Sequence, residues 1–264
     1  EPRGGLPSAG PSLHPTVAII CCLFAEKQAV DSVVDGRETI HKYRSGGDSN
    51  VYTLGWIGTH RAAVIGDSRE AVTSAGSITT RLLGNYQHVE HVLIVGCGGS
   101  VPHYTEASQH ARLGDVVVAG SDEAPYVFAH DALLDRKTDG VKGFAVRRWR
   151  PASGQLAEIA ARIGRDERAL EAWDEATNKA QERLQQLAPD QDFSRPAAAT
   201  DVLALRAGVA GNMVVVPHPE ERERSLVHVA PIGAVGTIRK PLGAAAAVDT
   251  STASSNAGNT TGGG

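Results

Sequence analysis

Two short apolar runs constrain the fold of this chain more than any other feature. The first is Val17–Leu23, and the second, His91–Val95, continues directly into a turn of sequence Gly-Cys-Gly-Gly-Ser. Strands of parallel sheet are covered on both faces, so they read as continuous apolar runs rather than as alternating ones. We therefore expect two buried strands of an α/β domain.

Segments of helical spacing alternate with short β-branched runs along the rest of the chain. Helices are expected at 26–34, 71–83 and 155–187, the last with a break at 164–166. Further strands are expected at 51–57, 61–65, 115–119, 213–216 and 226–229. This alternation predicts an α/β fold, a three-layer sandwich with a mixed, largely parallel central sheet.

The two ends of the chain differ in composition from its middle. Residues 1–15 are rich in proline and glycine, and residues 243–264 consist mainly of alanine, serine, threonine and glycine. Such compositions cannot bury enough apolar surface to form a core. We therefore expect a disordered leader at 1–15, one domain at 16–242 and a disordered tail at 243–264.

Charge and cysteine content exclude several classes of protein. The formal net charge is −4, which gives no electrostatic footprint for nucleic acid or an anionic membrane. No apolar run approaches the roughly 18 residues of a membrane span. Cys21, Cys22 and Cys97 fit neither a disulfide framework nor a metal site. The sequence thus predicts a cytoplasmic protein without metal or cofactor.

The glycine-rich turn after His91–Val95 is a candidate ligand shelf. In open α/β sheets, ligands bind outside the carboxyl ends of the strands, where small residues let them approach the backbone. No G-x-G-x-x-G motif opens a helix here, so a dinucleotide is not indicated. The alternative is a turn that serves only tight packing.

The segment from His91 to Gly120 combines an apolar strand, a V-G-x-x-G turn, a loop and the run R-L-G-D-V-V-V. This combination resembles the nucleoside phosphorylase and methylthioadenosine nucleosidase superfamily. Glu26, seven residues after Ile19, is similar to the acid that follows that family's first strand. The resemblance spans about 17–120 and implies a nucleoside-phosphorylase-like fold, with a helical insertion at about 151–190.

The resemblance also implies roles for individual residues. Glu26 falls where nucleosidases keep the catalytic carboxylate that orients the attacking water. Its alternative role is to open the first helix, where negative charge is favoured. Gly96, Cys97 and Gly98 fall where family members line the ribose and the base. Arg112 and Asp115 belong to the signature but are expected to be structural.

Departures from the family pattern affect the expected activity. Ile94 stands where phosphorylases of this group place a phosphate-binding arginine, so phosphate use is disfavoured. After Ile238 the sequence lacks the family's E-M-E type ribose clamp and its S-D type acid, which protonates the leaving purine. Asp249 lies in low-complexity sequence and is not assigned that role.

Two functions therefore remain open from the sequence. The first is a pseudoenzyme, a non-catalytic nucleoside-phosphorylase-like binding or scaffold domain of a larger protein, with protein partners. The alternative is a purine nucleosidase that hydrolyses the N-glycosidic bond of a nucleoside. The nucleosidase implies a nucleoside or purine ligand, whereas the pocket of the non-catalytic domain is either empty or used to sense such a ligand. The resemblance also implies a homo-oligomer.

Two further groups of polar residues are expected to have no functional role. His88, His91, His103 and His110 fit no common metal motif and are interpreted as surface or loop histidines. The charge run at 220–224 is interpreted as a solvated loop.

Overall fold

The computed structural model describes residues 14–41, 51–66, 71–100, 106, 109–120, 125–135, 140–151, 153–207, 212–218, 222 and 224–235. The predicted leader at 1–15 lies outside these residues except for His14 and Pro15. The predicted tail at 243–264 lies wholly outside them. The His14 ring stacks on His88, with the two ring centroids 4.6 Å apart.

The central sheet has five strands in the order β2-β3-β4-β1-β5. Their bounds are β1 (Val17–Cys21), β2 (Asp35–His41), β3 (Val51–Ile57), β4 (His60–Gly66) and β5 (His91–Val95). Strand β1 is parallel to both of its neighbours, and Ile19 lies opposite Val64 on β4 and Leu93 on β5. Both apolar runs are therefore strands that lie side by side in one sheet. Strand β1 is buried, as expected, but β5 is not, because it lies at the edge of the sheet, where Ile94 is 72% exposed.

The sheet is mixed, as expected, but the expectation of a largely parallel sheet is only partly correct. Strands β2 and β3 are antiparallel, and so are β3 and β4. The strands expected at 51–57 and 61–65 are β3 and β4, and the two-residue turn between them explains the second reversal, because such a turn joins antiparallel strands only. Gly58 in this turn has a φ of 59°, a left-handed conformation that glycine adopts without strain.

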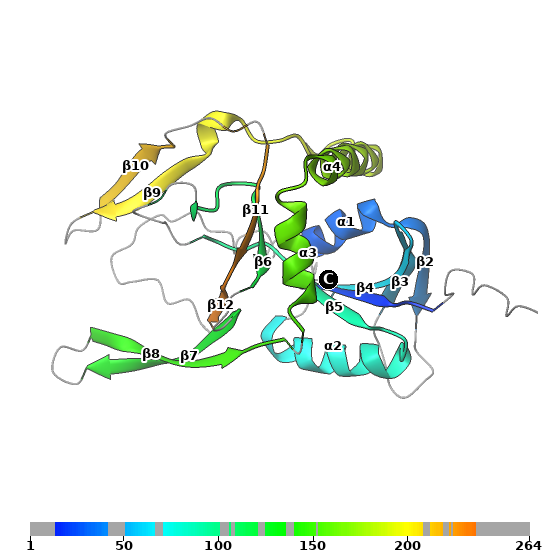
Figure 1. Ribbon diagram of the computed structural model, residues 1–264, viewed down its shortest axis with the longest axis horizontal. Helices are drawn as coiled ribbons and strands as arrows, with labels where there is room; N and C mark the ends of the chain where they lie inside the picture. The colour runs from blue at the N-terminus through cyan, green and yellow to red at the C-terminus, as the bar shows by residue number, and fades with distance from the viewer. Residues whose placement is uncertain are drawn as a thin grey trace, which may run out of the picture.

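Helices α1 (Phe24–Val33) and α2 (Ala71–Asn85) lie on opposite faces of this sheet (Figure 1). Alternate residues of β1 point to the two helices. The cluster on the α1 side contains Ile19, Cys21, Val30, Val34 and Val64. The cluster on the α2 side contains Ala18, Ile20, Tyr52, Leu54, Ala63, Ile65, Ile78, Leu82 and Tyr86. This packing confirms the predicted three-layer α/β sandwich.

The predicted helical segment forms two helices, α3 (Gln155–Ile163) and α4 (Glu167–Leu187). They are separated at the predicted break, where the Asp166 side chain accepts a hydrogen bond from the Arg168 amide at 3.1 Å and caps α4. Helix α4 packs on α1, and the Arg183 guanidinium donates to the Ser32 carbonyl at 2.9 Å. That this segment is an insertion remains a prediction.

The remaining strands form three smaller sheets. Strand β6 (Val116–Ala119) is parallel to β11 (Val227–Ala230). Strands β9 (Val202–Ala207) and β10 (Asn212–Pro217) are antiparallel, with the short helix η2 (Ala198–Thr200) before β9. Strand β7 (Tyr126–Asp135) pairs with β8 (Gly140–Trp149) and with β12 (Ile232–Val235). The strands expected at 115–119, 213–216 and 226–229 are confirmed, whereas β2, β7, β8, β9 and β12 were not predicted.

No helix among the described residues is both long enough and apolar enough to cross a membrane. Cys21, Cys22 and Cys97 are all free thiols.

Candidate functional site

The carboxylate of Glu26 joins the ends of β1 and β5. Its side chain is in the first turn of α1, and the residue is 8% exposed. Oε2 accepts hydrogen bonds from the amides of Cys22 at 2.9 Å and Leu23 at 2.8 Å. Oε1 accepts a third from the amide of Cys97, 71 residues away in sequence, at 2.8 Å. One side chain therefore holds two loops together at the carboxyl edge of the sheet.

The topology explains why these groups meet. Strands β1 and β5 are parallel neighbours, so their carboxyl ends lie at the same edge. The first amides of a helix have no partner within it, and an acid at the third helical position can accept one of them. Glu26 therefore lies in the first turn of α1 and caps it, which is the alternative role expected for this residue from the sequence. It also reaches the loop after β5.

The glycine turn lies directly against this carboxylate. A Cβ atom added to Gly96 would be 3.2 Å from Glu26 Oε1, which is closer than an ordinary contact. Cys97 is exposed, and a Cβ atom added to Gly98 would meet no atom within 4 Å. The structure thus brings Gly96 and Cys97 to Glu26 and leaves the turn open at Gly98. The binding and catalytic roles of these four residues remain predictions.

Several exposed apolar side chains belong to the elements that meet at this edge of the sheet. Phe24 at the start of α1 is 74% exposed, and Ile94 at the end of β5 is 72% exposed. Leu23 and Val95, their chain neighbours, are exposed as well. The edge of the sheet therefore combines one fixed carboxylate with an apolar surface.

Beneath α1 the polar groups are bonded to one another. Lys27 Nζ donates to Thr53 Oγ1 at 2.8 Å and forms an ion pair with Asp31. Burial, and next the negative charge of Glu26, raise the pKa of the Cys21 thiol to about 11. Cys21 is therefore a protonated thiol at neutral pH. The positive charge of Lys27 is balanced by Asp31 at the interface between α1 and the sheet.

A second polar cluster is centred on Asp115, whose side chain is 2% exposed. It accepts hydrogen bonds from the amides of Arg112 at 2.9 Å and Leu226 at 2.8 Å, and from Arg222 Nη1 at 3.0 Å. His228 Nε2 lies 2.8 Å from the same carboxylate. Asp115 therefore fastens the loop before β6 to the segment before β11, which is the structural role expected for it.

The pKa of Asp115 follows from these contacts. Burial is the largest influence and raises the pKa, but the amide hydrogen bonds of Arg112 and Leu226, followed by His228, outweigh it. The pKa of Asp115 is therefore lower than its ordinary value. Arg112 in turn pairs with Asp201, so it also has the structural role expected for it.

Two expectations about surface residues are wrong. His110 is 7% exposed and its ring stacks on His218, with centroids 5.5 Å apart, because the loops before β6 and after β10 fold together. Burial, and next the neighbouring His218, lower the pKa of His110. In the 220–224 run, Arg222 is not solvated but pairs with buried Asp115, and Arg224 pairs with Glu167. His103 and the glutamates of the run lie outside the described residues.

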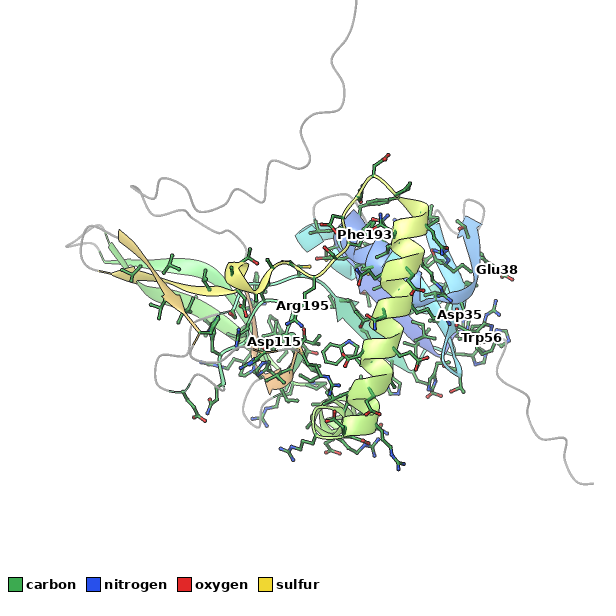
Figure 2. All side chains as sticks on the ribbon, turned by 90° about the horizontal axis from the view of Figure 1, so that it is seen from above. Asp35, Glu38, Trp56, Asp115, Phe193 and Arg195 are labelled. Carbon is green, nitrogen blue, oxygen red and sulfur yellow. The ribbon has the colours of Figure 1, made fainter. Side chains whose placement is uncertain are left out.

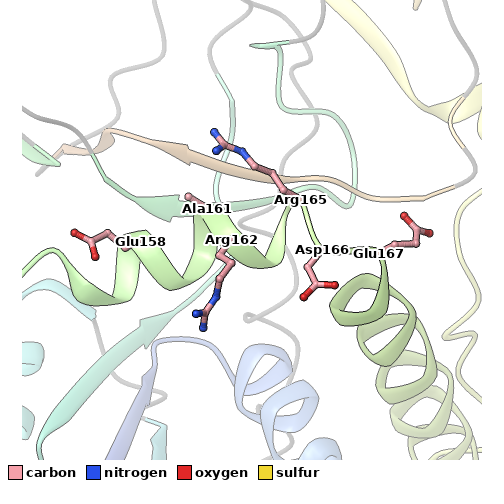
Figure 3. A pocket seen from close by; sticks show the side chains of 6 residues that line it. All are labelled: Glu158, Ala161, Arg162, Arg165, Asp166 and Glu167. Atoms are coloured by element: carbon pink, nitrogen blue, oxygen red, sulfur yellow. The ribbon is translucent and has the colours of Figure 1, made fainter.

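Two hollows elsewhere on the molecule do not include Glu26 or the glycine turn. One, of about 570 Å³, lies at the junction of α3 and α4. Figure 3 shows that its charged side chains point in different directions, so they form no convergent site. The other is a larger groove beside α4. Among the described residues, no group of three or more histidine, cysteine, aspartate or glutamate side chains could hold a metal ion.

Comparison with known proteins gives one curated relative and a set of solved structures. No protein-family model matches the chain. The relative is a nucleotide-binding leucine-rich repeat (NLR)-like protein from Hyaloscypha variabilis, 31% identical over 134 residues. That match covers 49% of this chain and only 13% of the relative.

The solved structures are nucleosidases and a related hydrolase. S-adenosylhomocysteine nucleosidase from Streptococcus pyogenes is 16% identical, with 58% of each chain covered and a TM-score of 0.37. Futalosine hydrolase of Helicobacter pylori is 15% identical, with 58% of this chain and 61% of that chain covered and a TM-score of 0.37. The methylthioadenosine/S-adenosylhomocysteine nucleosidase from Neisseria meningitidis is 16% identical, with 55% and 57% covered and a TM-score of 0.35.

Two of these structures are nucleosidases, the kind of protein that the sequence resembles. The chain covers less than two thirds of the length of each. At such TM-scores and identities the likeness carries no conclusion about activity, which has to come from the residues of the chain itself.

Proposed function

We propose that this chain is a nucleoside-binding domain of a larger protein and that it does not cleave its ligand. The observation that carries the proposal is the Glu26 carboxylate, fixed by the amides of Cys22, Leu23 and Cys97 beside an open glycine turn. An ionised carboxylate has more acceptor sites than these three donors use. Oε1, which accepts one amide, has room for a hydroxyl group of a ribose.

The surroundings of Glu26 match the other parts of a nucleoside. Gly96 and Gly98 let a sugar approach the backbone closely, because neither carries a side chain. Exposed Phe24, at the start of α1, offers apolar surface to the face of a purine. Ligand sites of this kind combine apolar walls with a few fixed polar groups.

The absence of catalysis is proposed on chemical grounds. Departure of a purine is assisted by an acid that protonates the base. Glu26 acts as an acceptor in all three of its hydrogen bonds, so it does not supply that proton. The relative, of which this chain spans 13%, supports a domain of a larger protein.

A purine nucleosidase is the second candidate. The same free acceptor site on Oε1 suits a water molecule that attacks the sugar carbon, with Glu26 as general base. Ile94 in place of a phosphate-binding arginine favours water over phosphate as the nucleophile.

Ligand binding and base release distinguish the two candidates. The protein is incubated with adenosine, inosine or 5′-methylthioadenosine, and both the unfolding temperature and the free base are measured. Saturation to about 100 times the Kd stabilises a protein by about 2.7 kcal/mol, so a bound nucleoside raises the unfolding temperature by several degrees.

We expect such a rise with at least one nucleoside and no free base. Glu26→Gln removes the rise, and the exposed control Glu90→Gln retains it. Release of base by the wild type but not by Glu26→Gln would establish the nucleosidase instead. A protein that no nucleoside stabilises and that releases no base would contradict both candidates.

The resemblance further supports a homo-oligomer. We also propose that the domain has protein partners and, because its cysteines suggest no disulfide framework, that it is cytoplasmic. Light scattering after size-exclusion chromatography tests the first of these proposals. A monomeric mass at micromolar concentration would contradict it.

A further inference from the structure

Two cysteine residues meet at the Glu26 carboxylate. Cys22 follows β1, Cys97 follows β5, and both are thiols. The Cys22 amide donates to Oε2 at 2.9 Å, and the Cys97 amide donates to Oε1 of the same carboxylate at 2.8 Å. They lie at the β5 side of the central sheet, whereas Glu38 and Trp56, labelled in Figure 2, are on β2 and β3 toward the opposite edge. One carboxyl group therefore holds the backbones of both cysteines.

The strand register gives the spacing between these two residues. Cys21 lies opposite Val95 on the parallel neighbour, so Cys22 and Cys97 are offset by one residue beyond the ends of the strands. Neighbouring strands are about 4.8 Å apart and rise about 3.3 Å per residue, so this offset separates the two Cα atoms by about 6 Å. Disulfides join cysteines whose Cα atoms are about 4.4–6.8 Å apart. The spacing therefore suits a disulfide bond.

The backbone at Cys22 has left the extended conformation of β1. Amides of successive strand residues point to opposite sides, whereas those of Cys22 and Leu23 both donate to Glu26 Oε2, in a bend. The alternation of side chains along β1 therefore ends before Cys22. On the other side of the carboxylate, a Cβ atom added to Gly98 would meet no atom within 4 Å, so the turn that carries Cys97 has room to adjust.

The three cysteines of the chain differ in access to an oxidant. Cys97 is exposed, Cys22 is partly buried and Cys21 is buried. Burial, and next the charge of Glu26, raise the pKa of the Cys21 thiol to about 11. Because the thiolate is the reactive form of cysteine, Cys21 is unreactive at neutral pH. It therefore serves as an internal control for the other two.

We propose that Cys22 and Cys97 are a redox pair that a small disulfide, such as glutathione disulfide, converts into an intramolecular disulfide bond across the Glu26 site. The Cys97 thiolate attacks one sulfur of the small disulfide and releases a first small thiol, and the Cys22 thiolate then attacks the Cys97 sulfur and releases the second. Two protein thiols are oxidised to one disulfide, the small disulfide is reduced to two thiols, and the two protons pass to the released thiols. In a reducing compartment such a bond is transient and redox-sensing.

The consequence for ligand binding rests on the proposed nucleoside site. The bond ties the glycine turn to the bend after β1 and places two sulfur atoms beside the Glu26 carboxylate. The turn is then no longer open to a ribose. We expect the oxidised protein to lose the rise in unfolding temperature that adenosine gives the reduced protein, and dithiothreitol to restore it.

Peptide mapping of the full chain tests the bond itself. The protein is incubated with glutathione disulfide, remaining thiols are alkylated, and the protein is digested with trypsin without reduction and analysed by mass spectrometry. We expect peptide 4–27 to be joined to peptide 82–112. Cys21→Ala retains this link. Cys22→Ser loses it and instead keeps one glutathione on Cys97, since no second thiol resolves the mixed disulfide.

The outcomes separate the redox pair from the nucleoside site. Absence of the link after oxidation of the wild type, its persistence in Cys22→Ser, or its presence only in a disulfide-linked dimer on a non-reducing gel would overturn the proposal. An adenosine response that oxidation leaves unchanged would overturn the closing of the site. A reduced protein without any response to nucleosides contradicts the proposed function alone, because the mapping needs no nucleoside.

Discussion

Replacing Asp115 by asparagine tests whether this buried carboxylate holds the segments before β6 and β11 together. Oδ2 takes part in the contacts with the Arg112 amide, Arg222 and His228, whereas Oδ1 accepts only the Leu226 amide. Asparagine keeps only one acceptor oxygen. In its lower-energy orientation this oxygen faces the three groups that contact Oδ2 of Asp115. The new NH₂ group then faces the Leu226 amide, and Arg222 loses its buried counter-charge.

The expected loss of stability follows from these two changes. A buried donor left without an acceptor costs about 1–3 kcal/mol, and removing one partner of a buried ion pair costs about 3–5 kcal/mol. Because asparagine still accepts a hydrogen bond from Arg222, we expect a total near the lower end of the summed range, about 4 kcal/mol. That is a large part of the roughly 5–15 kcal/mol that stabilises a typical domain.

Urea denaturation at neutral pH, followed by circular dichroism, measures this loss. The matched control is Asp174→Asn, which removes a half-exposed partner of Arg224 and should cost less than about 1 kcal/mol. If Asp115→Asn is no more destabilising than Asp174→Asn, the structural role assigned to the carboxylate is wrong.

Three further predictions follow from close contacts and from a pKa. Gly55→Ala brings the new Cβ into a clash with the Val34 side chain and should lower the free energy of unfolding, measured in urea, by about 2 kcal/mol or more. Its control is Gly84→Ala, whose Cβ meets no atom within 4 Å and which should not destabilise the protein. Gly96→Ala brings Cβ to 3.2 Å from Glu26 Oε1 and should weaken nucleoside binding about fivefold by calorimetry; unchanged affinity would contradict the shelf. The pKa of His110 is below its ordinary value of 6.5. Unfolding therefore takes up a proton below pH 6.5, so stability falls with acid there, and His110→Phe should reduce that fall in urea titrations at pH 7.5 and 5.5.

The sequence predicts the core of the fold well because that core depends on local patterns. Val17–Cys21 and His91–Val95 are short apolar runs, and they form the adjacent strands β1 and β5. The break between α3 and α4 is marked by Gly164 and Asp166, a glycine and a helix-capping acid. Strand β2, by contrast, was not predicted, because its sequence DGRETIH is mostly polar and lies at the edge of the sheet. Strands β7 and β8 contain charged residues that interrupt the apolar alternation.

The candidate site could be predicted in part, because its position follows from the two strands that local patterns predict. Parallel neighbours end at one edge of a sheet, so the topology alone brings Glu26 toward Cys97. The contact of Arg222 with Asp115 joins residues 107 positions apart on segments whose packing has no local signal. The charge run at 220–224 therefore looks solvated in the sequence, and the burial of His110 beside His218 is equally hidden. The groove beside α4 also arises only when these segments fold together.

A nucleoside titration followed by amide NMR tests the central claim most directly. Spectra of ¹⁵N-labelled protein are recorded as adenosine is added, and the ribose signals of the ligand are followed in the same tube for several hours. The account predicts progressive shifts of the amides of Gly96, Cys97 and Gly98 while the adenosine signals stay intact. Unshifted amides at these positions, or the appearance of free adenine and ribose, would contradict it.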